Sequence, residues 1–283
     1  MKIFNFFAAA FLVLSTSSCT DENLNKVLDT IGGELSDSEI AEGLKQALIV
    51  GTDTSTATLS AQGGYLNDPL VKILLPTAVQ SSIDQFKAKQ VNLGLLTVSG
   101  ADIYDGTNIL GITIPGLKTK EDELIEGINR AAESAAATAA PVFVNAITDM
   151  TILDANNILF GGIDTAATSY LRGNTYSTLF NQYEPRIESA LQSVTIGSTS
   201  VVDEYESFVN EYNSVLNTSI PGFGTLGSLM SLQTITATDL SVHGTNKGLD
   251  GLFLKIADEE KDIREDPLAR VNSILERVFG ALD

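Results

Sequence analysis

The sequence contains very few of the residues on which enzyme active sites most often depend. Among its 283 residues there are one cysteine, one histidine and no tryptophan. A single cysteine excludes an intramolecular disulfide, and a single histidine excludes a zinc site with two histidine ligands. A Ser-His-Asp triad would have to use His243, which we expect in a loop or at the start of a helix. Zinc-protease, nucleophile-elbow and dinucleotide motifs are also absent, so we predict no catalytic residues, no metal and no cofactor.

Basic residues are also scarce. The chain has 17 Lys and Arg against 36 Asp and Glu, which gives a formal net charge of −19 at pH 7. A surface with this charge repels the phosphates of nucleic acids and anionic lipid headgroups, and no basic patch offsets it. We therefore expect no nucleic-acid partner.

The N-terminus has the features of a secretory signal peptide. Lys2 precedes an apolar stretch from Ile3 to Leu14, and Thr16, Ser17 and Ser18 follow directly before Cys19. An apolar stretch of this length is too short to span a bilayer. We predict that residues 1–18 form the signal peptide.

The cysteine at the end of this segment resembles the acylated cysteine of a bacterial lipobox. Thr16 stands where the commonest lipobox has Leu, so the match is loose, and ordinary cleavage nearby stays open. Attached acyl chains anchor a protein to a membrane when more than one is present. We predict lipidation at Cys19, a tether over 19–35 and a single helical domain over 36–283. Asp21 and Glu22 resemble the acidic export tags of some surface lipoproteins, or form a solvated tether.

This reading places the protein outside the cytoplasm, as an outer-membrane or periplasm-facing lipoprotein or at the cell surface. Its expected partners are the membrane, through the N-terminal lipid, and an envelope protein of unknown identity. No second segment resembles a transmembrane span, since the best candidate, 131–147, contains Glu133, Pro141 and Asn145.

The residues after the tether predict an all-α fold, a multi-helix bundle of short helices. In the central stretch 121–178, small and apolar residues recur at helical spacing, namely Ile128, Ala132, Ala135, Ala139, Val142 and Ala146. Pro141 predicts a break in this pattern. We expect a helix from Thr151 to the Gly161-Gly162 pair and another from Thr165 to Arg172, which Gly173 ends.

The remaining helices are expected on both sides of this stretch. One begins at the capping box of Ser36 to Glu39 and stops at Gly51, and 52–60 reads as a loop by propensity. Pro185 is expected near a helix start. Over 203–216, aromatic and apolar residues lie on one face of a helix, which is typical of a helix packed on the core. This aromatic stripe consists of Tyr205, Phe208, Val209, Tyr212 and Leu216. Further helices are predicted over 76–88, 239–256 and 267–282.

The segment 94–116 departs from the helical pattern. Val98, Ile103 and Tyr104 lie before Asp105-Gly106, and Ile109, Ile112 and Ile114 follow it. Asp-Gly between β-forming residues is typical of a hairpin, so we predict a small β-hairpin insertion or an ordered loop. It is either a partner-binding feature or surface decoration.

Charged and amide residues in the central and C-terminal helices form the one candidate site. Its members are Asn129, Arg130, Glu133, Asp154, Thr168, Arg172, Asp250, Glu259, Glu260 and Arg264. Carboxylates with shifted pKa values act as acid and base on a glycoside, or bind a hard cation. Alternatively, the residues form ion pairs and caps that fix the packing of helices. The alternating charges of 258–270 favour a solvated helical face.

Three ordered groups of residues resemble a known bacterial family, catalogued as domain of unknown function 4197. The groups are Gly43 to Leu48; Asn129 to Glu133 with Asp154-Ala155, Ile158-Leu159, Gly161, Ala166 to Thr168, Tyr170 and Arg172; and Lys247 to Phe253 with Glu259-Glu260, Ile263-Arg264, Pro267 and Val278 to Gly280. The resemblance implies an all-helical, exported domain without an assigned reaction. It supplies no catalytic residues, and the family usually has a shorter link at 94–116. The resemblance also argues for a weak helix over 52–60, where propensity favours a loop.

Two functions follow from these observations. The first is a non-catalytic binding or structural module, held at the cell envelope by a lipid. The alternative is a small-molecule-binding, metal-binding or hydrolytic helical domain that uses the carboxylate and arginine cluster. An open pocket lined by Asn129, Glu133, Asp154 and Arg172 would favour the alternative, whereas the same residues paired and buried would favour the first.

Overall fold

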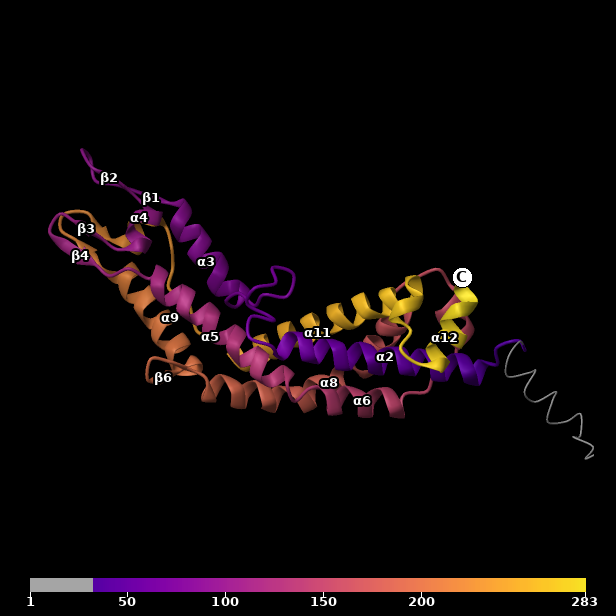
Figure 1. The fold of residues 1–283 in the computed structure, drawn as a ribbon. Coiled ribbons are helices and arrows are strands. Elements are labelled where there is room, and N and C mark those ends of the chain that lie inside the picture. Colours follow the sequence, from indigo (N-terminus) through magenta and orange to yellow (C-terminus); the bar gives the residue numbers. More distant parts are fainter. Residues whose placement is uncertain (1–32) are drawn as a thin grey trace, which may run out of the picture. The chain divides into compact units, whose positions relative to one another are not determined.

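The computed structural model describes residues 33–283, of which residues 37–283 form one compact unit (Figure 1). The predicted signal peptide, Cys19 and most of the predicted tether lie outside the described residues. The helices of the unit are α2 (Asp37–Ser60), α3 (Thr77–Ala88), α4 (Gly100–Asp105), α5 (Lys118–Ala136), α6 (Ala140–Asp149), α7 (Ala155–Phe160), α8 (Ala166–Ser193), α9 (Val201–Asn217), α10 (Leu226–Met230), α11 (Leu240–Glu265) and α12 (Ser273–Phe279).

Strands occur in residues 33–283 only as antiparallel pairs of two. The pairs are β1 (Gln90–Asn92) with β2 (Thr97–Ser99), β3 (Thr107–Ile109) with β4 (Ile112–Ile114), β5 (Thr195–Ile196) with β6 (Thr199–Ser200), and β7 (Ser219–Ile220) with β8 (Gly224–Thr225). Short 3₁₀ helices, η1 (Pro267–Ala269) and η2 (Gly280–Leu282), complete the C-terminal region. The prediction of an all-α fold with a small hairpin is confirmed.

The expectation of short helices is wrong for the centre of the fold, where α2, α8 and α11 pack together and are 24, 28 and 26 residues long. Small residues on α11 allow this close packing. A Cβ atom on Gly251 would lie 2.7 Å from Cε1 of Tyr65, and one on Gly248 would lie 3.3 Å from Cε1 of Tyr183. These two aromatic rings therefore contact the helix backbone where any larger side chain would displace them.

Three helix ends predicted from local sequence are wrong. Gly51 lies inside α2, Gly173 inside α8, and Pro185 inside α8 instead of near a helix start. The stretch 52–60, a loop by propensity, continues α2, as the family resemblance implied, and the hydroxyl of Thr52 donates to the carbonyl of Leu48 at 2.7 Å. Burial on both sides of each interruption outweighs a propensity cost of about 1 kcal/mol for a helical glycine.

The predicted break at Pro141 is confirmed, because α5 ends at Ala136 and Pro141 lies in the first turn of α6. The expected helix start at Thr151 is wrong. Helix α7 begins at Ala155, and the Asp154 side chain accepts a hydrogen bond from Asn157 at 2.7 Å instead of capping the backbone. The backbone carbonyl of Thr151 accepts a hydrogen bond from a tyrosine hydroxyl of α8, so this segment is fixed by α8.

The segment 94–116 contains more structure than one hairpin. Helix α4 separates the β1–β2 and β3–β4 hairpins, and Asp105-Gly106 ends α4 instead of forming a hairpin turn. The β3–β4 turn is formed by Leu110 and Gly111, with φ values of 51° and 89°. Two consecutive positive φ values are typical of the type I′ turn, whose twist suits a two-residue hairpin.

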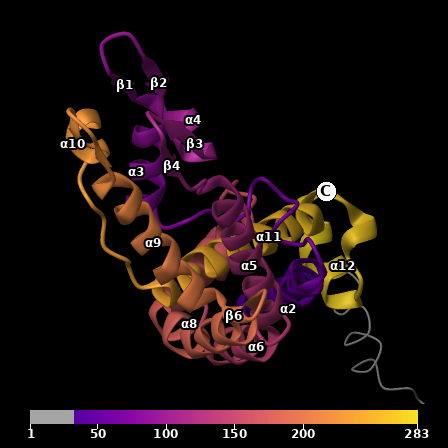
Figure 2. The same cartoon turned by 90° about the vertical axis from the view of Figure 1, so that its left-hand side faces the viewer.

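The aromatic stripe of α9 is buried, as predicted. Its Tyr212 ring lies 5.8 Å from the ring of Phe86 in α3, and the Tyr212 hydroxyl donates to the carbonyl of Ser82 at 3.1 Å. These contacts join α9 to α3. The two helices lead to α4, α10 and the first two hairpins, which lie at one end of the unit, away from α12 (Figures 1 and 2).

Candidate functional site

The most deeply buried charged residue of the predicted cluster is Glu260, on α11. Its carboxylate accepts hydrogen bonds from the backbone amides of Ala167 and Thr168 at 3.0 and 2.7 Å, and from the Thr168 hydroxyl at 2.7 Å. It also forms an ion pair with Arg264 at 2.9 Å. Because α8 begins at Ala166, Glu260 serves as an N-terminal cap supplied by another helix.

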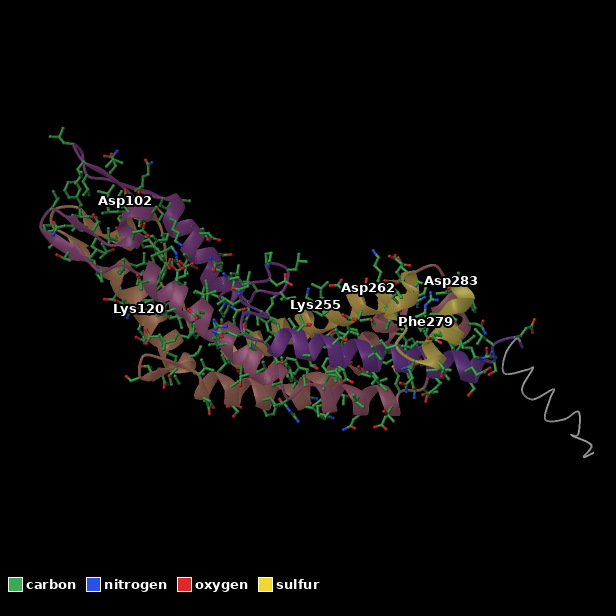
Figure 3. All side chains as sticks on the ribbon, in the orientation of Figure 1. Asp102, Lys120, Lys255, Asp262, Phe279 and Asp283 are labelled. Atoms are coloured by element: carbon green, nitrogen blue, oxygen red, sulfur yellow. The ribbon has the colours of Figure 1, made fainter. Side chains whose placement is uncertain are left out.

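Arg264 connects the same point to α7. Its guanidinium donates to the carbonyls of Leu159 and Ile158 at 2.9 and 3.0 Å, at the C-terminal end of α7. It also lies 5.6 Å from the centre of the Phe279 ring, which Figure 3 labels. Glu260 and Arg264 therefore fix the end of α7 and the start of α8, and both are buried, contrary to the expected solvated face.

Glu133 and Asn129 fix the chain that follows α2. One Glu133 oxygen accepts hydrogen bonds from the amides of Gly63, Tyr65 and Leu66 at 3.1 to 3.4 Å. The other oxygen pairs with Arg130 at 2.8 Å. Both groups of contacts are internal to the fold.

The Asn129 amide makes two hydrogen bonds with one backbone residue. Its oxygen accepts from the amide of Ile73 at 2.9 Å, and its nitrogen donates to the carbonyl of Ile73 at 2.7 Å. This pairing holds the segment 70–76, which forms neither helix nor strand, against α5. Asn129 is fully buried, so the structure uses it to position backbone.

Two members of the predicted cluster lie apart from the others. Asp154 is exposed and bonded to Asn157. Glu259 is partly buried, and burial, with Asp262 and Asp258 nearby, raises its pKa above the ordinary value (Asp262 is labelled in Figure 3). The predicted cluster is therefore not one site, since its members divide into separate groups with mainly internal contacts.

Arg172 and Asp250 are the members that reach solvent together. Arg172, on α8, forms an ion pair with Asp250, on α11, at 2.6 Å. Lys247 approaches the same carboxylate at 3.8 Å. The Arg172 guanidinium also lies 5.1 Å from the ring centres of Tyr176 and Phe253, which orient it through cation–π contacts.

These residues line a pocket of about 780 Å³ between α8, α11 and the segment 70–84. Apolar residues on its walls include Leu70, Val71, Leu74, Leu75, Phe253 and Leu254; polar ones include Lys72, Thr77, Gln80, Ser81, Asp84, Thr168, Arg172, His243, Lys247 and Asp250. Three cationic side chains thus meet two carboxylates in a protein that is otherwise strongly acidic.

His243 stands on the wall of this pocket, in the first turn of α11. Its Nε2 lies 2.9 Å from the carbonyl oxygen of Leu74. A carbonyl only accepts hydrogen bonds, so Nε2 carries the proton and the neutral ring keeps Nδ1 as an acceptor. Burial lowers the pKa of His243 below its ordinary value, and the contact with Leu74 opposes that effect.

Sequence analysis missed Lys72, Gln80 and Lys247 as residues of a site. Lys72 forms no ion pair with a carboxylate of residues 33–283, and the buried side-chain oxygen of Gln80 has no hydrogen-bond partner there. The positions of Lys72 and Gln80 in the sequence give no sign that they lie near α8 or α11. Lys247 and Asp250 are three residues apart on one helix, and this spacing could have indicated that Lys247 lies beside Asp250.

The lining of the pocket combines cationic side chains with apolar ones. Within residues 33–283, no group of three His, Cys, Asp or Glu side chains is arranged to hold a metal ion. None of the helices in the described part of the chain is both long and apolar enough to cross a membrane.

Comparison with known proteins gave one match. Neither a curated protein nor a solved structure matched the chain. The family model described as "Protein of unknown function (DUF4197)" matches residues 34–95 and 107–280. The internal gap in this match, residues 96–106, contains β2 and α4, so the chain departs from the family model within the segment 94–116, where extra structure was predicted. With matches over most of its length, the chain belongs to the DUF4197 family.

Proposed function

We propose that the protein is an exported, lipid-anchored protein of the cell envelope that binds a small anionic molecule and has no catalytic reaction of its own. The export and the anchor are supported by the sequence of residues 1–19, which has a basic residue, an apolar stretch and small residues before Cys19. The expected location is the outer membrane, facing the periplasm or the cell surface.

The observation that carries the binding function is the pocket around Arg172. Asp250 is shared by Arg172 and Lys247, so one carboxylate faces two cationic groups. Lys72 adds a third cation on the opposite wall. An anion that enters the pocket gains charge-assisted hydrogen bonds from these groups, and Leu70 and Leu74 offer contact to an apolar part of the same molecule.

The contacts of the other carboxylates favour binding over hydrolysis. General acid and base catalysis needs carboxylates that reach the substrate. Glu133 and Glu260 instead make hydrogen bonds to the backbone and ion pairs inside the fold. These contacts support a structural role for most of the predicted cluster and leave Arg172, Asp250 and Lys247 for a ligand.

The binding function is tested by thermal unfolding of the mature chain from Thr20, which retains the whole compact unit 37–283. The anions are phosphate, citrate, hexanoate and octanoate. A ligand at one hundred times its Kd stabilises the folded state by about 2.7 kcal/mol. We expect a concentration-dependent rise in Tm with the carboxylates that carry an apolar chain, because the pocket walls combine cations with leucines.

Matched variants connect this effect to the pocket. Arg172→Met and Lys247→Met remove a cation from the pocket, whereas Lys261→Met is the control. The side chains of Lys247 and Lys261 are both 51% exposed, and each pairs with a carboxylate on α11 at 3.8 Å. The pocket variants should lose the rise in Tm and the control should keep it. The proposal fails if no anion raises Tm, or if Lys261→Met loses the effect equally.

The anchor is tested separately in cells. Metabolic labelling with a palmitate analogue, followed by membrane fractionation, compares the natural chain with Cys19→Ala. We expect label and membrane association for the natural chain and loss of both in the variant. Equal fractionation without label in either chain contradicts the anchor and leaves the binding function untouched.

A further inference from the structure

Several segments of the chain, among them 54–67, 134–148 and 189–202, contain no Asp, Glu, Lys, Arg or His, and three others also carry a large exposed apolar side chain in a hairpin turn. These three uncharged segments are residues 90–101, 106–117 and 212–238, in a chain of which 19% of residues are charged. The first contains the β1–β2 hairpin, the second the β3–β4 hairpin, and the third the β7–β8 hairpin with α10. Only residues 102–105 separate the first two segments, whereas the third lies about one hundred residues further along the chain.

The fold brings these segments together. Helix α10 contacts β1, and α4 contacts both β2 and β3. Both views place the β1–β2 hairpin, the β3–β4 hairpin and α10 at the same end of the unit (Figures 1 and 2). Asp102, labelled in Figure 3, lies on α4 and is among the nearest charges, with Asp105 and Lys89.

Large apolar side chains project from the turns of this end. They are Leu95 and Leu96 between β1 and β2, Leu110 between β3 and β4, and Phe223 between β7 and β8, and we name these four residues the apolar tips. Leu95 is fully exposed, and the other three are 40 to 55% exposed. Asn, Thr, Ser and Gly surround them.

Neither burial nor backbone conformation explains the leucine at position 110. Leu110 has a φ of 51°, a conformation that Asn, Asp and Gly adopt more readily than leucine. Its side chain is 55% exposed, so contacts within residues 33–283 do not compensate fully. Exposed apolar residues that gather at one end of a molecule, unlike isolated ones, are typical of a contact surface.

We propose that the apolar tips insert into the surface of an electrically neutral lipid bilayer. Three separate, protruding turns fit a deformable interface better than a rigid protein surface, which would need three matching cavities. Uncharged Asn, Thr and Ser side chains are suited to hydrogen bonding with the headgroup layer around the inserted tips. The absence of basic residues from the three uncharged segments, together with the net charge of −19 for the whole chain, opposes binding to anionic lipids. The proposal is independent of the lipid anchor and of the pocket.

The test is cosedimentation of the mature chain from Thr20 with phosphatidylcholine vesicles, and with vesicles that also contain phosphatidylglycerol. We expect binding to the neutral vesicles and weaker binding as the anionic fraction rises. Replacement of one fully inserted leucine by a polar residue should lower the partition coefficient about ten- to hundredfold. Leu95→Asp is the first variant, since its exposed side chain makes the substitution harmless to folding.

Leu110→Asn separates membrane contact from structure. Asparagine adopts the required backbone conformation more readily than leucine, so this variant should keep or raise Tm while its binding to vesicles falls. The controls are Leu153→Asp and Leu268→Asp, whose side chains are 86% and 91% exposed outside the uncharged segments. These controls should bind vesicles like the unmodified chain.

Three results would overturn the proposal. The first is no binding to neutral vesicles. The second is binding that survives Leu95→Asp and Leu110→Asn, or that the controls lose equally, which would place membrane contact elsewhere. The third is a concentration-dependent dimer, measured by light scattering, that depends on the apolar tips, because they would then be the interface with a second copy of the chain.

Discussion

Replacement of Glu260 by alanine tests the structural role assigned to the buried part of the predicted cluster. The change removes the acceptor for the amides of Ala167 and Thr168 and leaves Arg264 without its carboxylate. Arg264 is 7% exposed, so its charge stays largely out of water. Loss of one partner from a buried ion pair costs about 3–5 kcal/mol, and we expect the free energy of unfolding to fall by that amount.

The measurement is urea-induced unfolding of the mature chain, followed by circular dichroism. For a domain of this size each kcal/mol corresponds to about 2–4 °C, so a drop of about 6–20 °C in Tm should accompany the change. Glu259→Ala is the control because Glu259 is the preceding residue of α11 and is only partly buried. Its effect should stay within about 0.5 kcal/mol, as for other surface substitutions.

A double variant distinguishes the buried ion pair from a general effect of mutating α11. Glu260→Leu with Arg264→Met removes both buried charges together, and should be less destabilised than the sum of the two single variants. If Glu260→Ala destabilises no more than Glu259→Ala, or if the two effects add without coupling, the assigned role of the pair is refuted.

Two further predictions concern helix packing and pH. Gly251→Ala should destabilise the protein by about 1–3 kcal/mol because its Cβ would meet Tyr65, whereas Gly173→Ala, with no atom within 4 Å of its Cβ, should stabilise it by about 0.5–1 kcal/mol. Opposite signs in urea unfolding are the expected result, and equal signs contradict the packing argument. The lowered pKa of His243 means that the unfolded chain binds a proton more readily. The folded state therefore loses stability as pH falls below about 6.5, and His243→Gln should reduce that loss between pH 7.5 and 5. An unchanged pH profile contradicts the role given to burial of His243.

Features that depend on neighbouring residues were predicted correctly from the sequence. Pro141 lacks an amide and clashes with the preceding turn, and it lies in the first turn of α6, after the end of α5. The aromatic stripe of α9 faces the core because its spacing places the rings on one side of a helix. Both follow from chain geometry alone.

Helix ends were predicted less well where packing outweighs propensity. Gly173 and Pro185 are unfavourable inside a helix, yet α8 continues through both because Leu171, Leu179 and Ile187 are buried along its length. At Asp105-Gly106 the turn residues were recognised, but they end α4, and the hairpin turn uses Leu110. The energy of contacts distant in sequence decided each case.

For the candidate site, the sequence indicated Arg172 and Asp250 but neither Lys72 nor the arrangement of the cluster. Glu260 and Arg264 are four apart, which predicts that they pair, but not that they are buried against the ends of α7 and α8. Lys72 came into the pocket only because Asn129 holds the segment 70–76 in place. The contact between Asn129 and Ile73 joins residues that are 56 positions apart in the sequence.

The sequence by itself determined that the chain is helical, where its central helix breaks and which face of α9 is buried. It also indicated the family. These features depend on local spacing and on ordered strings of residues. Only the tertiary structure decided that most of the predicted cluster fixes backbone, that Arg172, Asp250 and Lys247 line a pocket, and that three uncharged hairpins share one end of the unit. The physical reason is that burial and charge pairing depend on which distant segments meet, and local spacing carries no information about those meetings.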